Sequence, residues 1–391
     1  MKEKGIYILL FAILLGITGC GRRTNNVAPP WVVTSDSADQ SDAFDLKQII
    51  RNGELIMLTV SGPDTYYEYH GRGIGTQYLL CERFATKIGV SVRVELCHDS
   101  AEMQRKLDEG VGDIMVGAFP KDTEHPVIKG KGEAFDSLGW TVDSQKPLLQ
   151  QELRSWYRSS MLADVRQQEA EMLSAKNRVH RRVYAPMLDR ANGIISKWDD
   201  LFIANAPTAG WDWRLLAAQC YQESTFDPQA HSWAGACGLM QIMPTTADHL
   251  GLPRSQIYEP KANVEAAARL IAELTGSFSD VADRRERISF VLAAYNGGGG
   301  HIRDAMALTE KYGGNKYRWA DVARYVLLLQ EPQYYGDAVV RYGYMRGSET
   351  VDYVDKVNRR FNEYRGVHSP LGGSYSTPRK AQKERKSKYR S

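Results

Sequence analysis

The chain has 391 residues, enough for about two domains at roughly 150 residues per domain. Its composition, with 43% hydrophobic and 25% charged residues, excludes a disordered, collagen-like or multi-pass membrane protein for most of the chain. The 50 Lys and Arg residues against 47 Asp and Glu residues leave a formal net charge of +3, so no overall basic field would recruit nucleic acid. The 8 Trp and 21 Tyr residues suit sugar or peptide binding, although core packing explains most aromatic residues in any domain.

Residues 1–20 have the pattern of a secretory signal. The apolar run 6–17 follows two lysines and is too short to span ~30 Å of hydrocarbon. It continues into ITGC, which resembles a bacterial lipobox and implies removal of residues 1–19 and lipidation of Cys20. An ordinary signal ahead of a cysteine is the alternative. Lipid chains on Cys20 would hold the protein on a membrane. An acidic residue at positions 21–22 would indicate retention at the inner membrane, and neither position holds one. We therefore expect the outer membrane, facing the periplasm, with the inner membrane as the alternative.

The two ends of the remaining chain lack hydrophobic periodicity. Residues 20–44 are rich in Ser, Asp and Pro and are predicted to be a flexible tether. Residues 366–391 turn Gly- and Ser-rich and then basic, with Glu384 as their only acidic residue. We expect this segment to be a solvated, disordered tail, with attachment to anionic lipids or acidic wall polymers as a second hypothesis.

The four other cysteines fall into two pairs, each inside one predicted folded region. A periplasmic location permits the disulfides Cys81–Cys97 and Cys220–Cys237, but buried free thiols remain an equal alternative. The sequence has no CxxC or HExxH motif and no cluster among its 8 histidines. We therefore expect neither a metal site nor another cofactor.

The first folded region, residues 45–160, alternates strands and helices. This alternation predicts right-handed crossover connections and a parallel sheet covered by helices. The Gly-rich stretch 71–75 lies too far after the first strand for a phosphate-binding loop, so nucleotide binding is disfavoured. The expected elements are strand 54–60, helix 78–88 ending at Gly89, strand 90–96, helix 100–109 capped by Ser100, and strand 113–119.

This order, with a tyrosine-rich hairpin at residues 66–69, resembles the first lobe of a periplasmic solute-binding domain of the amino-acid type. The second lobe of such domains is missing, because only residues 120–138 separate the third strand from a returning strand at 139–142. Lys121 and its neighbours also stand where the ligand-clamping arginine is expected. We interpret the region as a one-lobe docking or spacing module, with cell-wall machinery as its possible partner, rather than as a sensor; a scaffold without any ligand is the alternative.

Residues 147–206 are predicted to be helical throughout, with 161–195 connecting the two folded regions. The apolar helix 213–221 then leads into Glu223. An apolar setting and the negative end of the helix dipole would both raise the pKa of this carboxyl, as a general acid near neutral pH requires. A Glu at a helix end is more often a solvated surface residue, so the neighbouring motifs are needed to decide whether Glu223 is a catalytic acid.

Three separated motifs follow in register: Gln222-Glu223-Ser224 with Ser232 after it, GACGLMQIMP at 235–244, and AAYNG at 293–297. Together they resemble the soluble lytic transglycosylase domain, which has a lysozyme-like fold. The preceding solute-binding-like lobe and the stretch 343–349 resemble the membrane-bound lytic murein transglycosylase F group. The resemblance implies an α+β multidomain protein: a truncated α/β solute-binding-like lobe followed by a mostly α, lysozyme-like catalytic domain at 196–365.

The resemblance also implies roles for single residues. Glu223 would be the catalytic acid and base. Ser232 and Tyr295 would orient its carboxyl or the substrate acetamido group, while Gln241 and Asn296 would position N-acetyl or hydroxyl groups. The remaining members of the predicted site are Met243, which would wall the sugar site, and Tyr353, which would close it from the last helix.

One carboxylate fits a transglycosylase better than a hydrolase. Glycosidases normally flank the scissile bond with two acids, and Asp227, the nearest other acid, is predicted to be a turn residue. The expected reaction on peptidoglycan glycan strands cleaves the β-1,4 bond between N-acetylmuramic acid and N-acetylglucosamine and forms 1,6-anhydromuramic acid. The alternatives are a hydrolytic muramidase and a weak or inactive peptidoglycan-binding lipoprotein.

Overall fold

The computed structural model describes residues 44–117, 132–135, 138–174 and 179–365. The predicted signal peptide, Cys20, the tether before Phe44, Lys121 and the basic tail lie outside these residues. None of the described helices is long and apolar enough to cross a membrane.

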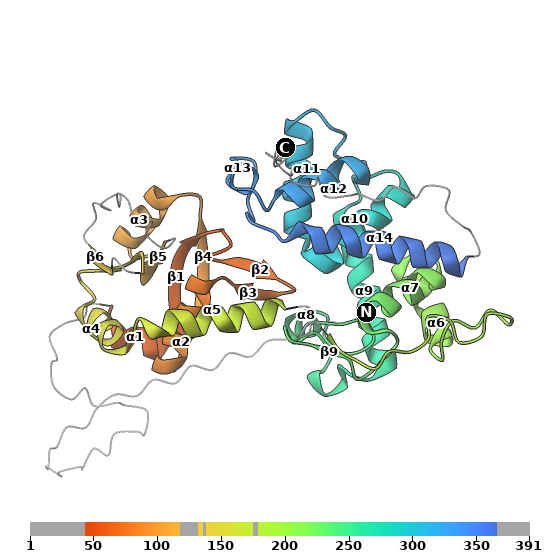
Figure 1. Ribbon diagram of the computed structural model, residues 1–391, viewed down its shortest axis with the longest axis horizontal. Coiled ribbons are helices and arrows are strands. Elements are labelled where there is room, and N and C mark those ends of the chain that lie inside the picture. The colour runs from red at the N-terminus through yellow and green to blue at the C-terminus, as the bar shows by residue number, and fades with distance from the viewer. Residues whose placement is uncertain (1–43, 118–131, 136–137, 175–178, 366–391) are drawn as a thin grey trace, which may run out of the picture. The chain divides into compact units, whose positions relative to one another are not determined.

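The first part of the chain forms a five-stranded sheet with the order β4-β1-β5-β7-β6 (Figure 1). Strand β1 pairs in parallel with β4 and β5, as predicted, but β7 pairs antiparallel with both β5 and β6. The three strands of the alternating pattern are thus parallel, as expected, and the returning strand, whose direction was not predicted, is antiparallel. A parallel return needs a crossover connection, usually a helix, and no helix lies between β5 and β7 in the described residues. The strands are β1 (Glu54–Val60), β4 (Ser91–Cys97), β5 (Ile114–Val116), β6 (Gly132–Phe135) and β7 (Trp140–Asp143).

Helices cover both faces of this sheet because side chains of β1 alternate between two apolar clusters. Met57 belongs to the cluster that contains Phe84 of α2, whereas Leu58 packs with Met103 of α3. Helix α2 ends where Gly89 adopts φ 79°, which confirms the predicted glycine stop. The helices of this part are α1 (Leu46–Asn52), α2 (Thr76–Ile88), α3 (Ser100–Asp108), α4 (Pro147–Trp156) and α5 (Ser160–Leu173).

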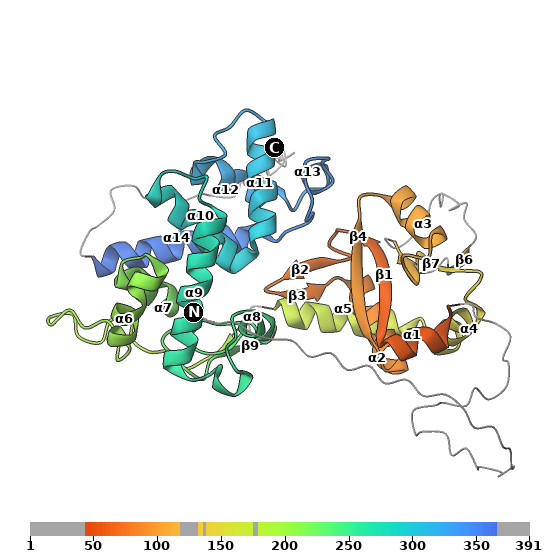
Figure 2. The same ribbon diagram turned by 180° about the vertical axis from the view of Figure 1, so that it is seen from behind.

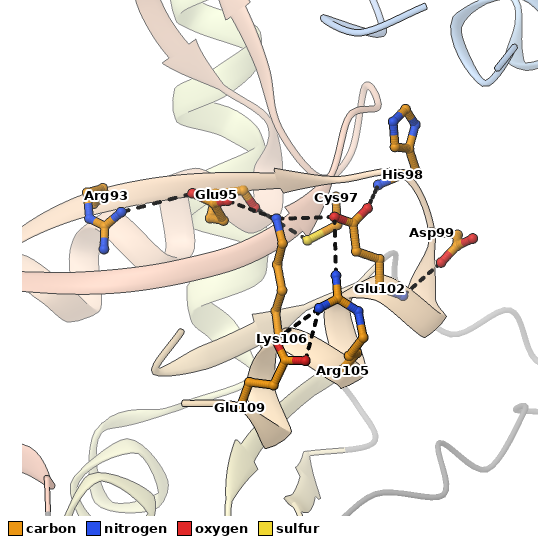
Figure 3. A network of polar contacts seen from close by, with 9 residues as sticks. All are labelled: Arg93, Glu95, Cys97, His98, Asp99, Glu102, Arg105, Lys106 and Glu109. Atoms are coloured by element: carbon orange, nitrogen blue, oxygen red, sulfur yellow. Dashed lines mark hydrogen bonds and ion pairs between the residues drawn. The ribbon is translucent and has the colours of Figure 1, made fainter. Parts of the chain in front are cut away.

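A polar network fixes the start of α3 beside the end of β4 (Figure 3). The Asp99 carboxylate accepts a 2.8 Å hydrogen bond from the Glu102 backbone N–H, so Asp99 and not Ser100 is the N-cap. The Glu102 carboxylate in turn accepts from the His98 backbone N–H at 2.8 Å and pairs with Lys106 at 3.2 Å. Lys106 also reaches Glu95 of β4, so one cation joins the helix to the strand.

All four described cysteines are free thiols, so the two disulfides considered from the sequence are absent and buried thiols are the correct alternative. Cys81 and Cys97 belong to the clusters on different faces of the sheet. Cys220 and Cys237 share one core but have separate partners. The Cys220 thiol donates to the Leu239 carbonyl, and the Cys237 thiol donates to the Tyr258 hydroxyl.

The second part is mostly helical and has its own apolar core, which confirms the predicted α+β fold. Helix α14 packs against α7, α10 and α12, and Figure 2 shows these helices from behind. Its buried Val354 joins Leu216 of α7 and Phe290 of α10 in the core. The helices are α6 (Asp199–Ala209), α7 (Trp213–Ser224), α8 (Pro244–His249), α9 (Pro260–Ser277), α10 (Arg284–Gly297), α11 (Gly299–Lys311), α12 (Trp319–Leu328), α13 (Pro332–Tyr335) and α14 (Gly347–Tyr364).

The region between the two parts differs from the prediction of continuous helix over 147–206. Helix α5 buries Val165 in the sheet's core, so it packs with the sheet instead of acting as a connector. Strand β8 (Val179–His180) then pairs antiparallel with β9 (His231–Ser232). The chain beyond β8 stays extended because its polar backbone finds partners there: the Arg182 N–H donates to Asp227 at 2.6 Å, and the Pro186 carbonyl accepts from Tyr364 at 2.5 Å.

Candidate active site

Glu223 lies in the last turn of α7, one residue before the helix ends. Thr225 terminates the helix with φ 51°, and Phe226 follows with φ 65°, both in a region that non-glycine residues rarely adopt. Hydrogen bonds hold this turn. The Thr225 hydroxyl donates to the Arg182 carbonyl at 2.8 Å, and the Trp198 indole donates to the Phe226 carbonyl at 3.2 Å. These contacts hold the turn that directly follows Glu223.

Burial raises the pKa of the Glu223 carboxyl to about 7. Two neighbours act in the opposite direction, a hydrogen bond from Tyr353 and the positive charge of Arg181. A carboxyl with a pKa near 7 exchanges a proton readily at neutral pH, as a group that first donates and then accepts a proton must. The predicted rise in this pKa is confirmed, with burial as its main cause.

Tyr353 is the side chain that orients Glu223. Its hydroxyl, on α14, donates a 2.6 Å hydrogen bond to Oε1 of Glu223. Burial raises the pKa of this phenol well above its usual value, so it remains a donor at neutral pH. The hydrogen bond to the Glu223 carboxyl thus comes from Tyr353, and the other role expected of Ser232 and Tyr295, toward the substrate acetamido group, stays a prediction. Ser232 Oγ accepts instead from the Ala236 N–H at 2.9 Å, and Tyr295 donates to the Met240 carbonyl at 2.7 Å.

Arg181, which directly follows β8, closes the end of the catalytic helix. Its Nη1 donates to the carbonyls of Gln222 at 3.1 Å and of Glu223 at 2.9 Å. These are carbonyls that the end of a helix leaves without partners, and a cation there opposes the negative end of the helix dipole. No sequence motif singled out Arg181, since the predicted helix would have carried this residue away from α7.

A cavity of about 410 Å³ opens in front of Glu223. Five further residues of the predicted site line it: Ser232, Gln241, Met243, Tyr295 and Asn296. Tyr353 is not part of this lining and reaches the carboxyl from within the protein. The structure therefore brings together residues from three separate motifs, as their spacing predicted.

Gln241 presents an unused acceptor at this cavity. Its Nε2 donates to the carbonyls of Ala230 and Gly238, at 3.1 and 2.9 Å, which fixes the amide orientation. Its Oε1 is buried and has no hydrogen bond from the described residues. Gly238 has φ 79° and lies so close to Asn263 that any side chain would collide with it. The loop thus holds Gln241 ready to accept an N–H from a ligand.

Asn296 and Gly297 hold the end of α10 against α14. The Thr350 hydroxyl donates to Oδ1 of Asn296 at 2.9 Å. A Cβ at Gly297 would lie 2.6 Å from Thr350 Oγ1, so the absent side chain permits close helix packing. Among the four glycines at 297–300, only Gly298 has a positive φ.

Comparisons with known proteins identify the group to which these residues belong. Residues 200–318 match the family model described as the transglycosylase SLT domain. The membrane-bound lytic murein transglycosylase F of Desulfosudis oleivorans is 37% identical over 178 residues, which cover 46% of this chain and 37% of that protein. This half of the chain is therefore similar to membrane-bound lytic murein transglycosylase F and contains the match to the transglycosylase SLT domain.

The transglycosylase F of Citrobacter koseri is 25% identical over 436 aligned positions, covering 84% of this chain and 82% of that protein. The 70 kDa soluble lytic transglycosylase of Escherichia coli, a solved structure, is 24% identical with a TM-score of 0.29, over 44% of this chain and 25% of that one. The SLT match includes Glu223 and the five lining residues of the predicted site, but it ends before Tyr353.

The β2–β3 hairpin also contributes to the cavity that Glu223 lines. Strands β2 (Tyr67–Tyr69) and β3 (Arg72–Ile74) pair antiparallel, and Glu68, His70 and Gly71 line the cavity. The hairpin packs its aromatic rings on the helical part, with Tyr69 stacked on Trp233 at 5.9 Å between ring centroids. The sequence predicted the hairpin but offered no signal that it borders the catalytic residue.

Glu68, at an exposed position of β2, is a second carboxyl at the cavity, and partial desolvation by its surroundings raises its pKa. Asp227, in contrast, accepts hydrogen bonds from the backbone N–H groups of Arg182 and Gln229, which confirms its predicted turn role. No group of three or more His, Cys, Asp or Glu residues that could hold a metal ion occurs in the part of the chain that the structure describes.

Proposed function

We propose that this chain is a peptidoglycan lytic transglycosylase with Glu223 as its catalytic acid and base. One observation carries the proposal. The carboxyl with the pKa of about 7 lies at the cavity formed by the three transglycosylase motifs, and Tyr353 fixes its direction. A carboxyl kept protonated near pH 7 supplies the proton that a glycosidic oxygen needs on leaving.

In the first step, the 2-acetamido oxygen of N-acetylmuramic acid attacks the anomeric carbon. The C1–O bond to the next N-acetylglucosamine breaks, and Glu223 gives its proton to the leaving oxygen. In the second step, the Glu223 carboxylate takes the proton of the sugar's 6-hydroxyl, whose oxygen attacks the anomeric carbon and releases the acetamido oxygen. The 1,6-anhydro ring closes, Glu223 is protonated again, and no water is consumed.

The remaining site residues have supporting roles in this proposal. Gln241 Oε1 accepts the acetamido N–H, because it is the buried acceptor at the cavity that lacks a partner among the described residues. Met243 and Tyr295 wall the sugar site, and Ser232 and Asn296 hold its loops. Each of these side chains touches the cavity from the element that its motif fixes in place.

For its location, we propose the periplasmic face of the outer membrane, with lipid on Cys20 as the anchor. The lipobox-like ITGC and the membrane-bound relatives support this placement. Cys20→Ser should release the protein from membranes without changing the activity of the purified folded part, and release is measured by separating membranes from the soluble fraction.

Product mass tests the reaction. Purified peptidoglycan digested with the protein should release muropeptides one water lighter than hydrolysis products. Glu223→Gln keeps the acceptor for Tyr353 but has no proton to donate, so turnover should fall at least 100-fold. Reducing-end muramic acid as the main product would identify a hydrolytic muramidase. Binding of glycan without any product from the unmutated protein would identify a binding lipoprotein.

A further inference from the structure

The N-terminus of α11 lines the same cavity as Glu223. Gly298, Gly299, Gly300 and His301 all line it. The backbone N–H groups of residues 299–301 belong to the first helical turn, which leaves such groups without helical partners. The described residues offer no cap, since the N-cap is Gly298 and has no side chain to accept a hydrogen bond.

His301 adds an independent observation at the same place. Its side chain lines the cavity, is only 6% exposed, and has no hydrogen bond at Nδ1 from the described residues. Burial lowers the pKa of this imidazole to about 4, so it is neutral at pH 7. A buried N–H without a partner costs more than a buried lone pair. The proton therefore lies on Nε2, which makes the opposite edge of the ring a hydrogen-bond donor.

The surroundings of His301 keep the ring in place. Tyr342 packs edge-on against it, with 6.0 Å between ring centroids. A Cβ at Gly300 would lie 2.6 Å from the Tyr342 ring, so only glycine leaves room for this contact. The Asp304 carboxylate fixes Tyr342 by accepting from its backbone N–H at 2.7 Å. His301 and Tyr342 thus form a built wall at the helix N-terminus.

The chemistry of the cavity decides which ligand fits these donors. Helix N-termini attract oxygen atoms that carry negative or partial negative charge. The described lining includes the carboxyls of Glu68 and Glu223 but no Lys or Arg, so an anion would lack a counter-ion. A neutral carbonyl oxygen satisfies the same donors without this repulsion.

We propose that the first turn of α11 and His301 bind an amide carbonyl oxygen of the peptidoglycan substrate. This inference rests on the proposed function for the identity of the substrate, and it adds a binding subsite to that function. Two amide groups of peptidoglycan carry such an oxygen: the acetamido group of a sugar, and the bond that joins the stem peptide to the lactyl group of muramic acid.

Binding in the Glu223→Gln background tests the subsite without turnover. The probes are a β-1,4-linked N-acetylglucosamine tetramer, a glycan fragment stripped of peptide, and a glycan fragment that carries stem peptides. His301→Leu should weaken binding about three- to tenfold, the effect of one hydrogen bond, and His301→Gln, which keeps a donor near the Nε2 position, should restore most of it. His249→Leu, at a largely exposed histidine outside the cavity, is the matched control.

The set of probes that lose affinity shows which of the two amide carbonyls binds. Loss of affinity for all three probes identifies the acetamido carbonyl, whereas loss for the peptide-bearing fragment alone identifies the stem amide. Unchanged affinity of folded His301→Leu for every probe would overturn the inference. Absence of anhydro products from the unmutated protein would instead overturn the proposed function, because the binding assay needs no turnover.

A second pair of variants tests the helix N-terminus even where His301→Leu does not fold. Gly299 is the first residue of α11, and a Cβ added there would meet nothing within 4 Å. Proline is well tolerated at the first position of a helix, and there it removes the backbone N–H. Gly298 already has a ψ of 131°, which suits a residue before proline. Gly299→Pro should bind about threefold or more weakly than Gly299→Ala, which keeps the N–H. Equal affinity of the two would overturn the role of the helix N-terminus.

Discussion

At the scale of single residues, the chemistry depends on the balance that sets the protonation of Glu223. Burial disfavours the carboxylate, and the Tyr353 hydrogen bond favours it. These opposing influences place the pKa at about 7 instead of higher. The same hydrogen bond selects one oxygen of the carboxyl, Oε1, and leaves the other to face a substrate. Tyr353 therefore acts on both the direction and the acidity of the catalytic group.

This balance predicts the pH dependence of turnover. Glu223 must be protonated at the start, so activity should fall as pH rises through about 7. Tyr353→Phe removes a donor that lowers this pKa, so the alkaline limb of the pH profile should move to higher pH. Maximal turnover should also drop about 10- to 100-fold, as expected for a lost hydrogen bond to a charged group.

Peptidoglycan solubilisation measured from pH 5 to 9 checks this prediction. Tyr364→Phe is a matched control, because that hydroxyl donates to the Pro186 carbonyl and has no contact with Glu223. An unchanged alkaline limb in Tyr353→Phe would show that another group sets the profile.

At the scale of elements, the short β8–β9 ladder brings Arg181 to the end of α7. Val179 pairs with Ser232 and His180 with His231, so the residue after β8 meets the helix C-terminus. One guanidinium nitrogen of Arg181, Nη1, then donates to two carbonyls of the last turn. An extended segment outside the SLT match thereby supports the catalytic helix.

Two substitutions of Arg181 separate its charge from its hydrogen bonds. Arg181→Met should lower stability by about 0.5–1.5 kcal/mol and raise the Glu223 pKa, which moves the alkaline limb of activity to higher pH. Arg181→Lys keeps the charge but does not place a donor at the position of Nη1, so the limb should stay near its original position while stability still falls. Thermal unfolding together with pH profiles measures both effects. A shifted limb in Arg181→Lys as well would show that geometry, and not charge, sets the pKa.

Local sequence patterns predicted the elements whose causes are local. Strand 54–60 is an apolar run and Gly89 is a glycine stop, and both appear where expected. The motif residues around Glu223 meet because each lies on an element that its own motif defines. The failures involve distant partners. The non-helical chain after β8 and the bond between Glu223 and Tyr353, 130 residues apart, depend on contacts that no local pattern contains.

At the scale of the whole chain, two carboxyls line the cavity, and they come from different parts of the chain. Glu223 belongs to the helical part, and Glu68 belongs to the hairpin beside the sheet. Hydrolytic glycosidases normally use two carboxyl groups at the sugar-binding site. Glu68, however, lies at an exposed position of β2 and no hydrogen bond from the described residues orients it, whereas Tyr353 orients Glu223. We therefore expect Glu68 to border the substrate without taking part in bond cleavage.

Glu68→Gln tests this division because it keeps the shape of the side chain but removes its acid. Turnover of peptidoglycan should change less than about tenfold, and the products should remain 1,6-anhydro sugars, because the substrate's own acetamido and hydroxyl groups supply the nucleophiles. Glu223→Gln, measured beside it, should abolish the same products. Mass analysis of both digests gives the answer. If Glu68→Gln were as inactive as Glu223→Gln and the unmutated protein gave reducing ends, two-carboxylate hydrolysis would replace the single-acid mechanism.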